Sequence, residues 1–276
     1  MEPRTALMTQ LLPAALLFAL ALAPGSAASE TLVKLTTPRG VSQSLLLIKP
    51  EQPPAAAVIL FAGGHGALGL SGPGKMRWGS GNFLVRTRDT FVRHGLMVAV
   101  MDAPADQQSG MNAIFRMGAA HAGDIGAVAG RLRAETNVPV WLIGTSMGTF
   151  SAAGGAIGAK GIDGLVLTST ITRAQPTWLI SGSHPHGVAS MNLPRIPAPT
   201  LIMSHRHDGC SITPAADAPK LKARLTAAKP AEIVVLDGGA PPISKPCEAK
   251  SQHGFFGIEE EAVAAIARFV KTHPPI

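Results

Sequence analysis

The residues from Gly144 to Gly148 read Gly-Thr-Ser-Met-Gly, a G-x-S-x-G motif that is typical of nucleophilic serines. An apolar run, 139–143, precedes the motif, and small residues beginning at Thr149 follow it. This pattern predicts a strand, a sharp turn that carries Ser146, and then a helix. In such a turn the serine is strained, its Oγ projects above the sheet edge, and the next backbone N–H points into the same space.

A serine nucleophile needs a base and an acid, and the sequence offers both downstream of Ser146. Asp208 follows one apolar run, and His253 lies in the loop between the last apolar run and an amphipathic C-terminal segment. Gly254 would let the imidazole of His253 reach the serine. We therefore predict a Ser146, His253 and Asp208 triad, with the chain order Ser, Asp, His.

Other ionisable residues are weaker candidates for these roles. Asp102 follows the strand that ends at Met101 and is the alternative acid, although it precedes the serine in the chain. Asp124 and Glu135 lie in a helix-like segment, where we expect them to be solvated. Among the 9 histidines, His253 alone lies between the last strand and the last helix.

A glycine-rich segment, 61–69, follows the first buried apolar run. It contains the spacing Gly64-x-Gly66-x-x-Gly69 of a dinucleotide-binding fingerprint, but the Ser-Gly-Pro-Gly sequence after it breaks the helix that such a site requires. A phosphate-binding loop is also disfavoured, because Met76 stands where a Ser or Thr would bind magnesium.

Backbone donation is the better use of this glycine-rich segment. Glycines let the chain approach a substrate carbonyl closely, so an N–H of this segment and the N–H of Met147 would form an oxyanion hole. The sequence leaves two residues open as the donor in the loop, Gly64 and His65. His65 is alternatively a substrate contact or an ordinary loop histidine.

Two histidine pairs resemble parts of a metal site. His205 and His207 stand next to Asp208, and His184 and His186 flank a proline. Neither spacing supplies the further ligands that a zinc hydrolase needs, so we predict no metal. The triad chemistry also requires no organic cofactor.

Residues 1–28 are typical of a cleaved signal peptide. Arg4 precedes an apolar stretch from Leu7 to Ala23, and small residues lead to a cleavage site after Ala28. We expect an exported protein, periplasmic or extracellular, without a membrane anchor after cleavage.

Cys210 and Cys247 are the 2 cysteines of the chain. In an exported protein they indicate one disulfide, which would tie the loop of Asp208 to the loop of His253. Two free buried thiols are the alternative.

Strand-like and helix-like segments alternate after an N-terminal hairpin made of 31–34 and 44–48. The later apolar runs are rich in Val, Ile and Leu without alternation, which is typical of parallel strands buried on both faces. We predict an α/β fold: a doubly wound, mostly parallel sheet of about eight strands in one domain, 29–276. Prolines exclude a long helix from 171–198, which is either a short cap or a surface loop. The predicted strands are 57–61, 96–101, 138–143, 165–168, 200–203 and 233–236, and the predicted helices are 83–94, 115–134, 148–158, 215–228 and 259–271.

The formal net charge is +7, but the Lys and Arg residues are scattered. Aromatic residues make up 4% of the chain, too few for base-stacking platforms. We therefore predict no nucleic-acid partner and a small molecule as the substrate.

The Gly144–Gly148 motif, Asp208 and His253 together resemble the α/β-hydrolase superfamily over nearly all of the mature chain. The small-cap esterases and the dienelactone-hydrolase-like branch are most similar. This resemblance implies hydrolysis of carboxylic esters through an acyl-enzyme. Amide, peptide or lactone cleavage by the same triad and a non-catalytic binding role remain alternatives. The chain departs from many lipases and esterases in its Gly-Gly-His-Gly loop, 63–66, where they have His-Gly-Gly-Gly.

Overall fold

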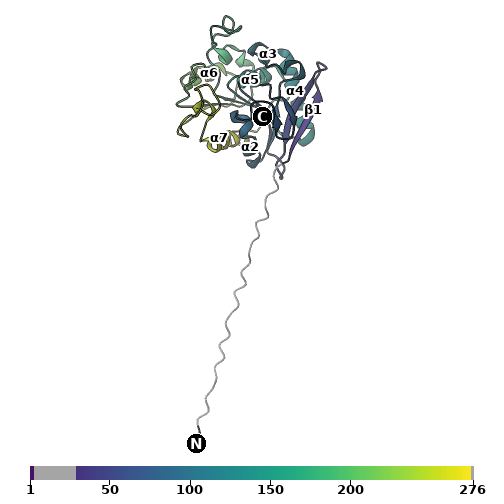
Figure 1. Ribbon diagram of the computed structural model, residues 1–276, viewed down its shortest axis with the longest axis vertical. Helices are drawn as coiled ribbons and strands as arrows, with labels where there is room; N and C mark the ends of the chain where they lie inside the picture. Colours follow the sequence, from purple (N-terminus) through teal and green to yellow (C-terminus); the bar gives the residue numbers. More distant parts are fainter. Residues whose placement is uncertain (3–28, 275–276) are drawn as a thin grey trace.

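The computed structural model describes residues 1–2 and 29–274, which contain an eight-stranded sheet flanked by helices (Figure 1). Residues 3–28, most of the predicted signal peptide, lie outside the described part of the chain. Within the described part, no helix has the length and apolar content that a membrane span requires.

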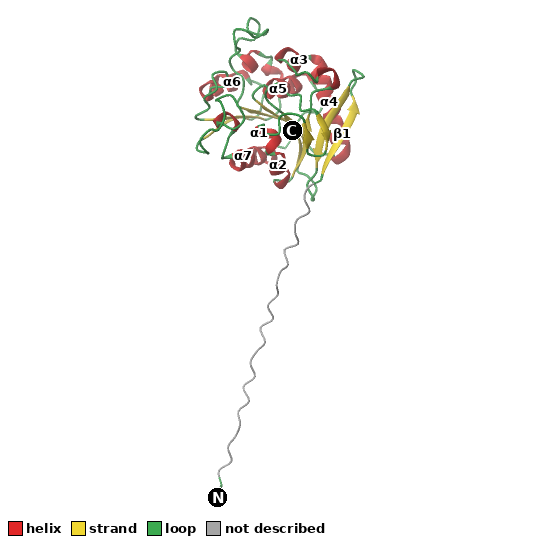
Figure 2. Ribbon diagram, viewed as in Figure 1, coloured by secondary structure: helices red, strands yellow, loops and turns green. Residues whose placement is uncertain are grey.

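The main sheet, whose strands are yellow in Figure 2, is mostly parallel, as predicted. Its strands are β1 (Glu30–Thr36), β2 (Ser42–Ile48), β3 (Ala56–Phe61), β6 (Leu96–Met101), β7 (Val140–Thr145), β8 (Gly164–Thr168), β9 (Thr200–His205) and β10 (Ala231–Leu236). The strand order is β1-β2-β6-β3-β7-β8-β9-β10. β2 runs antiparallel to both β1 and β6, and all other neighbours are parallel. The predicted fold class, including the N-terminal hairpin, is confirmed.

Helices cover both faces of the sheet, because the central strands are buried on both sides. The helices are α1 (Phe83–Arg86), α2 (Arg88–Arg93), α3 (Ala113–Met117), α4 (Ala119–Thr136), α5 (Gly148–Gly158), α6 (Ala218–Arg224) and α7 (Glu259–Thr272). Successive side chains of a strand point to opposite faces. Ile59 and Leu142 therefore pack with residues of helices α3, α4, α5 and α6 in one core. Val58 and Ile143 join α1, α2 and α7 in the other.

Two of the predicted helices are each divided in the structure. The segment 83–94 breaks at Thr87, whose hydroxyl and N–H both donate to the carbonyl of Phe83. The segment 115–134 breaks at Gly118, which has an extended backbone. A short hairpin, β4 (Leu70–Gly72) and β5 (Lys75–Met76), was not predicted, because its strands are too short to give a periodic pattern.

Segment 171–198 contains two short 3-10 turns, Gly187–Ser190 and Leu193–Arg195, and no α-helix. Most of its large apolar side chains are buried in the core on the α5 side of the sheet, including those of Ile180, Val188 and Ile196, whereas Leu179 is exposed. The segment is therefore packed onto the domain along much of its length.

The prediction of a solvated Asp124 is wrong. Its side chain is buried in α4, and its carboxylate accepts hydrogen bonds from Arg39 at 2.8 and 3.1 Å. Arg39 lies in the turn between β1 and β2, far from Asp124 in the sequence. Glu135 is also largely covered, and it forms ion pairs with Lys49 and Arg131. Helical position alone gave no sign of these distant partners.

Candidate active site

Ser146 lies in a tight turn between β7 and α5, with a left-handed backbone φ of 52°. A non-glycine residue rarely adopts this conformation, and it is the strained geometry that holds a nucleophilic serine. Both motif glycines are required by close packing. A Cβ on Gly144 would lie 2.4 Å from the carbonyl oxygen of Gly148, and one on Gly148 would lie 2.1 Å from that of Phe61.

The glycine-rich loop after β3 packs directly against Ser146. A Cβ built on Gly63 would lie 3.0 Å from the Cβ of Ser146. The loop is held from one side by Asp102, a buried residue just after β6. Its carboxylate accepts hydrogen bonds from the backbone N–H groups of Leu68 at 2.7 Å and Leu70 at 2.9 Å. Asp102, the alternative acid, is therefore occupied with the backbone of this loop.

Arg116 of α3 holds the same loop from within the protein. Its guanidinium is fully buried and donates to the carbonyl of Gly64 at 3.1 Å and to the Oγ of Ser151 at 3.0 Å. Burial lowers the pKa of Arg116 to about 9. Sequence analysis missed this residue, because an arginine on a short helix carries no signal of its buried carbonyl partners.

His65 belongs to this loop, and its side chain does not line the cavity that contains Ser146. Its ring lies 3.8 Å from that of Trp78, centroid to centroid, and its Nδ1 accepts the N–H of Ala67 at 3.1 Å. Burial lowers the pKa of His65, and the charges of Arg116 and Arg77 lower it further. These contacts favour a neutral imidazole.

Three backbone N–H groups near Ser146 are free to bind a ligand. Those of Gly64, His65 and Met147 donate to no acceptor among the residues that the structure describes. An oxyanion hole is built from backbone N–H groups that are free in this way.

Asp208 and His253 form a buried pair in the loops that follow β9 and β10. Nδ1 of His253 lies 3.0 Å from Oδ2 of Asp208, whose side chain is 0% exposed. The other carboxylate oxygen accepts the N–H of Cys210 at 2.9 Å. This geometry lets a carboxylate fix the tautomer of an imidazole and stabilise its charged form.

Thr213 contacts both members of the Asp208–His253 pair. Its Oγ1 donates to Oδ2 of Asp208 at 2.9 Å and lies 3.1 Å from Nδ1 of His253. The sequence had not suggested this residue, although it lies five positions after Asp208. A hydroxyl at such a short separation from a candidate acid is the only signal that the chain offered.

The backbone of His253 is fixed from two sides. Ser169, which follows β8, donates its Oγ to the carbonyl of His253 at 2.7 Å. Ser251 accepts the N–H of His253 at 3.3 Å. The imidazole is thus held by three loops that leave the same sheet edge.

The predicted disulfide is present between Cys210 and Cys247, with the Cα atoms 4.6 Å apart. It joins the loop of Asp208 to the loop of His253, because β9 and β10 are neighbours in the sheet.

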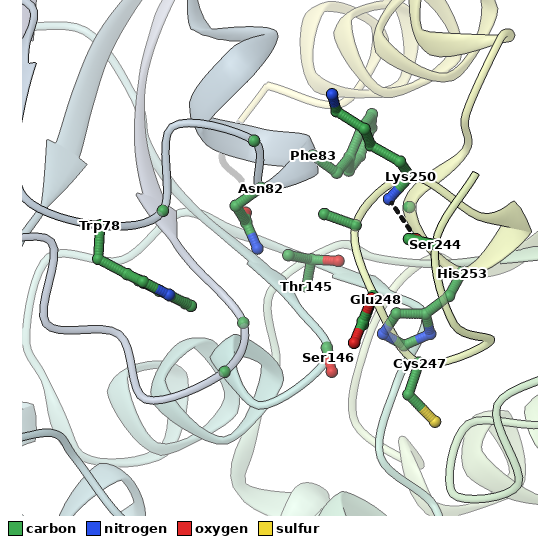
Figure 3. A pocket seen from close by; sticks show the side chains of 16 residues that line it. Trp78, Asn82, Phe83, Thr145, Ser146, Ser244, Cys247, Glu248, Lys250 and His253 are labelled. Atoms are coloured by element: carbon green, nitrogen blue, oxygen red, sulfur yellow. Dashed lines mark hydrogen bonds between the residues drawn. The ribbon is translucent and has the colours of Figure 1, made fainter. Parts of the chain in front are cut away.

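Ser146 and His253 line one cavity of about 520 Å³. Figure 3 shows Ser146 and His253 near each other and Trp78 on the far side of the cavity, with Asn82 between Trp78 and these two residues. Nε2 of His253 is buried and forms no hydrogen bond with any described residue, Ser146 included. A hydrogen bond between a base and a nucleophile often forms or tightens only when substrate binds.

The other sequence candidates do not assemble into sites. The glycine-rich loop leads into β4 rather than a helix, which excludes the dinucleotide fingerprint. His205 contacts the carbonyl of Gly238 at 3.0 Å and the N–H of His207. Among the described residues, no three His, Cys, Asp or Glu side chains are grouped as metal ligands.

Neither a family model nor a curated protein matches the sequence. Solved structures do match over most of the chain. The esterase Pf2001 of Pyrococcus furiosus is 18% identical with a TM-score of 0.64, covering 90% of this chain and 92% of its own. XC6422 of Xanthomonas campestris, described as an α/β serine hydrolase without a lid, is 15% identical with a TM-score of 0.58, covering 92% and 99%. Dipeptidyl peptidase 4 of Porphyromonas gingivalis is 11% identical with a TM-score of 0.62, covering 90% of this chain and 36% of its own.

These similarities, together with the sheet order and the serine turn, define the α/β-hydrolase fold. The resemblance inferred from the sequence is confirmed at the level of the fold.

Proposed function

We propose that this protein is a serine hydrolase that cleaves carboxylic esters with Ser146 as nucleophile, His253 as base and Asp208 as the acid that orients the base. One observation carries the proposal: a buried Asp208–His253 pair borders the same cavity as a serine in a strained turn. The esterase fold neighbours support this reaction class.

In the first half of the reaction, Nε2 of His253 takes the proton of the Ser146 hydroxyl. The serine oxygen attacks the ester carbonyl and forms a tetrahedral intermediate. Asp208 accepts the Nδ1–H of His253 and stabilises the imidazolium. Collapse of the intermediate then releases the alcohol, which takes its proton from His253.

The oxyanion of the intermediate would bind the N–H of Met147 and an N–H of the glycine-rich loop. Gly64 is the better loop donor, because it lines the cavity and follows Gly63, which packs on Ser146. His65 is placed further along, with its ring stacked on Trp78. Loss of one such donor typically lowers kcat by about 100- to 1,000-fold.

In the second half, water attacks the acyl-enzyme while His253 again acts as base. The carboxylic acid leaves, and Ser146 recovers its proton. The acid, base and nucleophile that this cycle needs all come from the chain, so we propose no metal and no organic cofactor.

Cleavage of an amide or peptide bond is the second candidate reaction. The dipeptidyl peptidase neighbour shows that the fold also occurs in a peptidase. The same three residues would serve both reactions, and only the walls of the cavity would discriminate between them.

We further propose that the protein acts outside the cytoplasm on a small-molecule ester. The disulfide between Cys210 and Cys247 supports export, because such bonds persist in oxidising compartments.

A panel of p-nitrophenyl esters from acetyl to long acyl chains tests the proposed function. Purified mature wild type should hydrolyse the shorter esters, and Ser146→Ala should lose this turnover. A serine-reactive phosphonate should label the wild type but not the variant. Absence of turnover and labelling in folded wild type would favour a binding role instead.

A further inference from the structure

Two cavities are lined by neighbouring residues of the serine turn, Ser146 in one and Met147 in the other, and their linings differ in chemistry. The first, of about 520 Å³, contains Ser146 and His253. The second, of about 270 Å³, is bordered by Met147 and by side chains of α3 and segment 171–198. An ester bound to Ser146 has two arms, so each cavity is placed to receive one of them.

The position of His253 decides which arm enters which cavity. The imidazole must give its proton to the leaving alcohol oxygen, so the alcohol lies on the histidine side of the reacting carbon. His253 lines the first cavity and not the second. The alcohol therefore belongs in the first cavity and the acyl arm in the second, beside Met147.

The second cavity is apolar and small. Its walls are mainly apolar, and the polar side chains among them are those of Asn112 and Thr177. The apolar walls include Ile114, Trp178, Leu179 and Ile180. At about 270 Å³ it is smaller than the range of roughly 300–1,000 Å³ that is usual for drug-sized ligands. A short hydrocarbon chain fits these walls, whereas a charged acyl group would find no opposite charge among them and a hydroxylated one would meet few polar side chains.

The first cavity is lined by polar and charged side chains that keep free hydrogen-bonding groups among the residues that the structure describes. Nδ2 of Asn82 lies 3.4 Å from the Cβ position of Gly63, next to Ser146, and forms no hydrogen bond with the described residues. Glu248 and Lys250 lie on the opposite wall (Figure 3), and neither forms an ion pair among the described residues. One carboxylate oxygen of Glu248 accepts the N–H of Lys245 at 3.1 Å, which leaves the other oxygen free. Oδ1 of Asn82 is buried without a partner.

This set mixes hydrogen-bond donors with acceptors and balances one negative charge with one positive charge. A hydroxyl group both donates and accepts. It can therefore donate to the carboxylate of Glu248, accept from the ammonium of Lys250, or do either with the amide of Asn82. A neutral alcohol with several hydroxyls matches the set, whereas a charged alcohol would meet one like charge.

We propose that the substrates are esters of a short apolar acid with a neutral, hydroxyl-rich alcohol. The acid occupies the cavity beyond Met147, and the alcohol occupies the cavity of Asn82, Glu248 and Lys250. This assignment rests on the proposed ester hydrolysis by Ser146.

A pair of isomeric esters tests the assignment directly. Glyceryl monobutyrate has an apolar acid and a polar alcohol, and hydrolysis gives butyrate and glycerol. Butyl glycerate reverses the polarity and gives glycerate and 1-butanol. We expect kcat/KM to be at least about tenfold higher for glyceryl monobutyrate, since one such mismatch is usually a factor of 10 or more.

The outcomes separate this inference from the proposed function. Equal rates, or faster cleavage of butyl glycerate, would overturn the assignment while ester hydrolysis stands. Cleavage of p-nitrophenyl acetate with neither isomer turned over would also overturn it. No turnover of any of the three esters would remove the proposed function itself.

Two variants test the assignment of each cavity. Leu179→Asp places a charge on the rim of the apolar cavity at a side chain that is 82% exposed, so folding should be retained. It should lower kcat/KM for p-nitrophenyl butyrate about tenfold more than for the acetate, whereas Ile243→Asp, exposed and outside both cavities, should not. An unchanged butyrate-to-acetate ratio in Leu179→Asp would contradict the acyl assignment.

Asn82→Leu keeps the size of the side chain and removes the amide. It should raise KM several-fold more for glyceryl monobutyrate than for ethyl butyrate, whose alcohol has no free hydroxyl to bind the amide. An equal loss on both esters would indicate a structural role for Asn82 and would contradict the alcohol assignment.

Discussion

At the scale of single residues, Asp208, His253 and Thr213 form a closed triangle of short contacts. The threonine hydroxyl donates to the same carboxylate oxygen that faces the imidazole. Charge-assisted hydrogen bonds of this type are shorter and stronger than neutral ones. Thr213 thus both anchors the carboxylate and limits the positions that the ring of His253 can take.

Thr213→Val should lower kcat of the proposed hydrolase by about tenfold, because the carboxylate loses one of its fixed donors. Thr213→Ser should restore most of the activity, since it keeps the hydroxyl. The pH dependence of kcat/KM separates positioning from plain destabilisation: we expect the acidic limb to move in Thr213→Val. A valine variant with wild-type kcat and pH profile would exclude the role.

Ser146 and His253 act as one unit in the proposed mechanism, so their substitutions should not be additive. Ser146→Ala and His253→Ala should each lower kcat by several orders of magnitude, with the fold retained. The double variant should be about as slow as either single one. Steady-state kinetics with p-nitrophenyl acetate measure this, and a further large loss in the double variant would show that the residues act independently.

At the scale of elements, the central strands β3, β6, β7, β8 and β9 could be predicted from the sequence because their residues are buried on both faces and form unbroken apolar runs. The order of Ser146, Asp208 and His253 along the chain was also sufficient to suggest the candidate site. Arg116 and the Arg39–Asp124 pair could not be predicted, because their partners are backbone carbonyls or residues far away in sequence. Local sequence patterns therefore predict which residues are buried, but they do not predict polar pairs between residues that are distant in the sequence.

The disulfide is the covalent link between the loops of the acid and the base. Cys210 and Cys247 are separated by 37 positions, for which the chain-entropy model gives a stabilisation of about 4 kcal/mol. Cys210→Ser should therefore lower the melting temperature and, by loosening both loops, the activity. Calorimetry in oxidising buffer measures the shift. Reduced wild type should match the variant, and equal melting temperatures for oxidised wild type and variant would contradict the prediction.

At the scale of the whole molecule, both faces of the sheet carry a continuous core, and buried polar groups occur where loops must be held. His121 of α4 is an exception: it is fully buried, and neither ring nitrogen has a hydrogen-bond partner among the described residues. Its ring lies among aromatic rings, 5.2 Å from that of Phe115 and 6.1 Å from that of Phe61.

Burial, and then the charges of Arg116 and Arg39, lower the pKa of His121 from 6.5 to about 3. Between these values the unfolded chain binds a proton at His121 that the folded protein does not bind. The free energy of unfolding should therefore fall by about 1.4 kcal/mol per pH unit from this residue as the pH falls through the window. This pH dependence should disappear above pH 6.5, where His121 is neutral in both the folded and the unfolded chain.

His121→Phe should remove this dependence, because phenylalanine fits among the same rings and does not titrate. The free energy of unfolding of the variant should exceed that of wild type by an amount that grows as the pH falls below 6.5. Urea unfolding at several pH values measures the difference, and His186→Phe, at an exposed position, is the matched control. If the free energy of unfolding depended on pH in the same way for wild type and His121→Phe, His121 would have to be protonated in the folded protein. The core around α4 would then have to accommodate a charge beside Arg116.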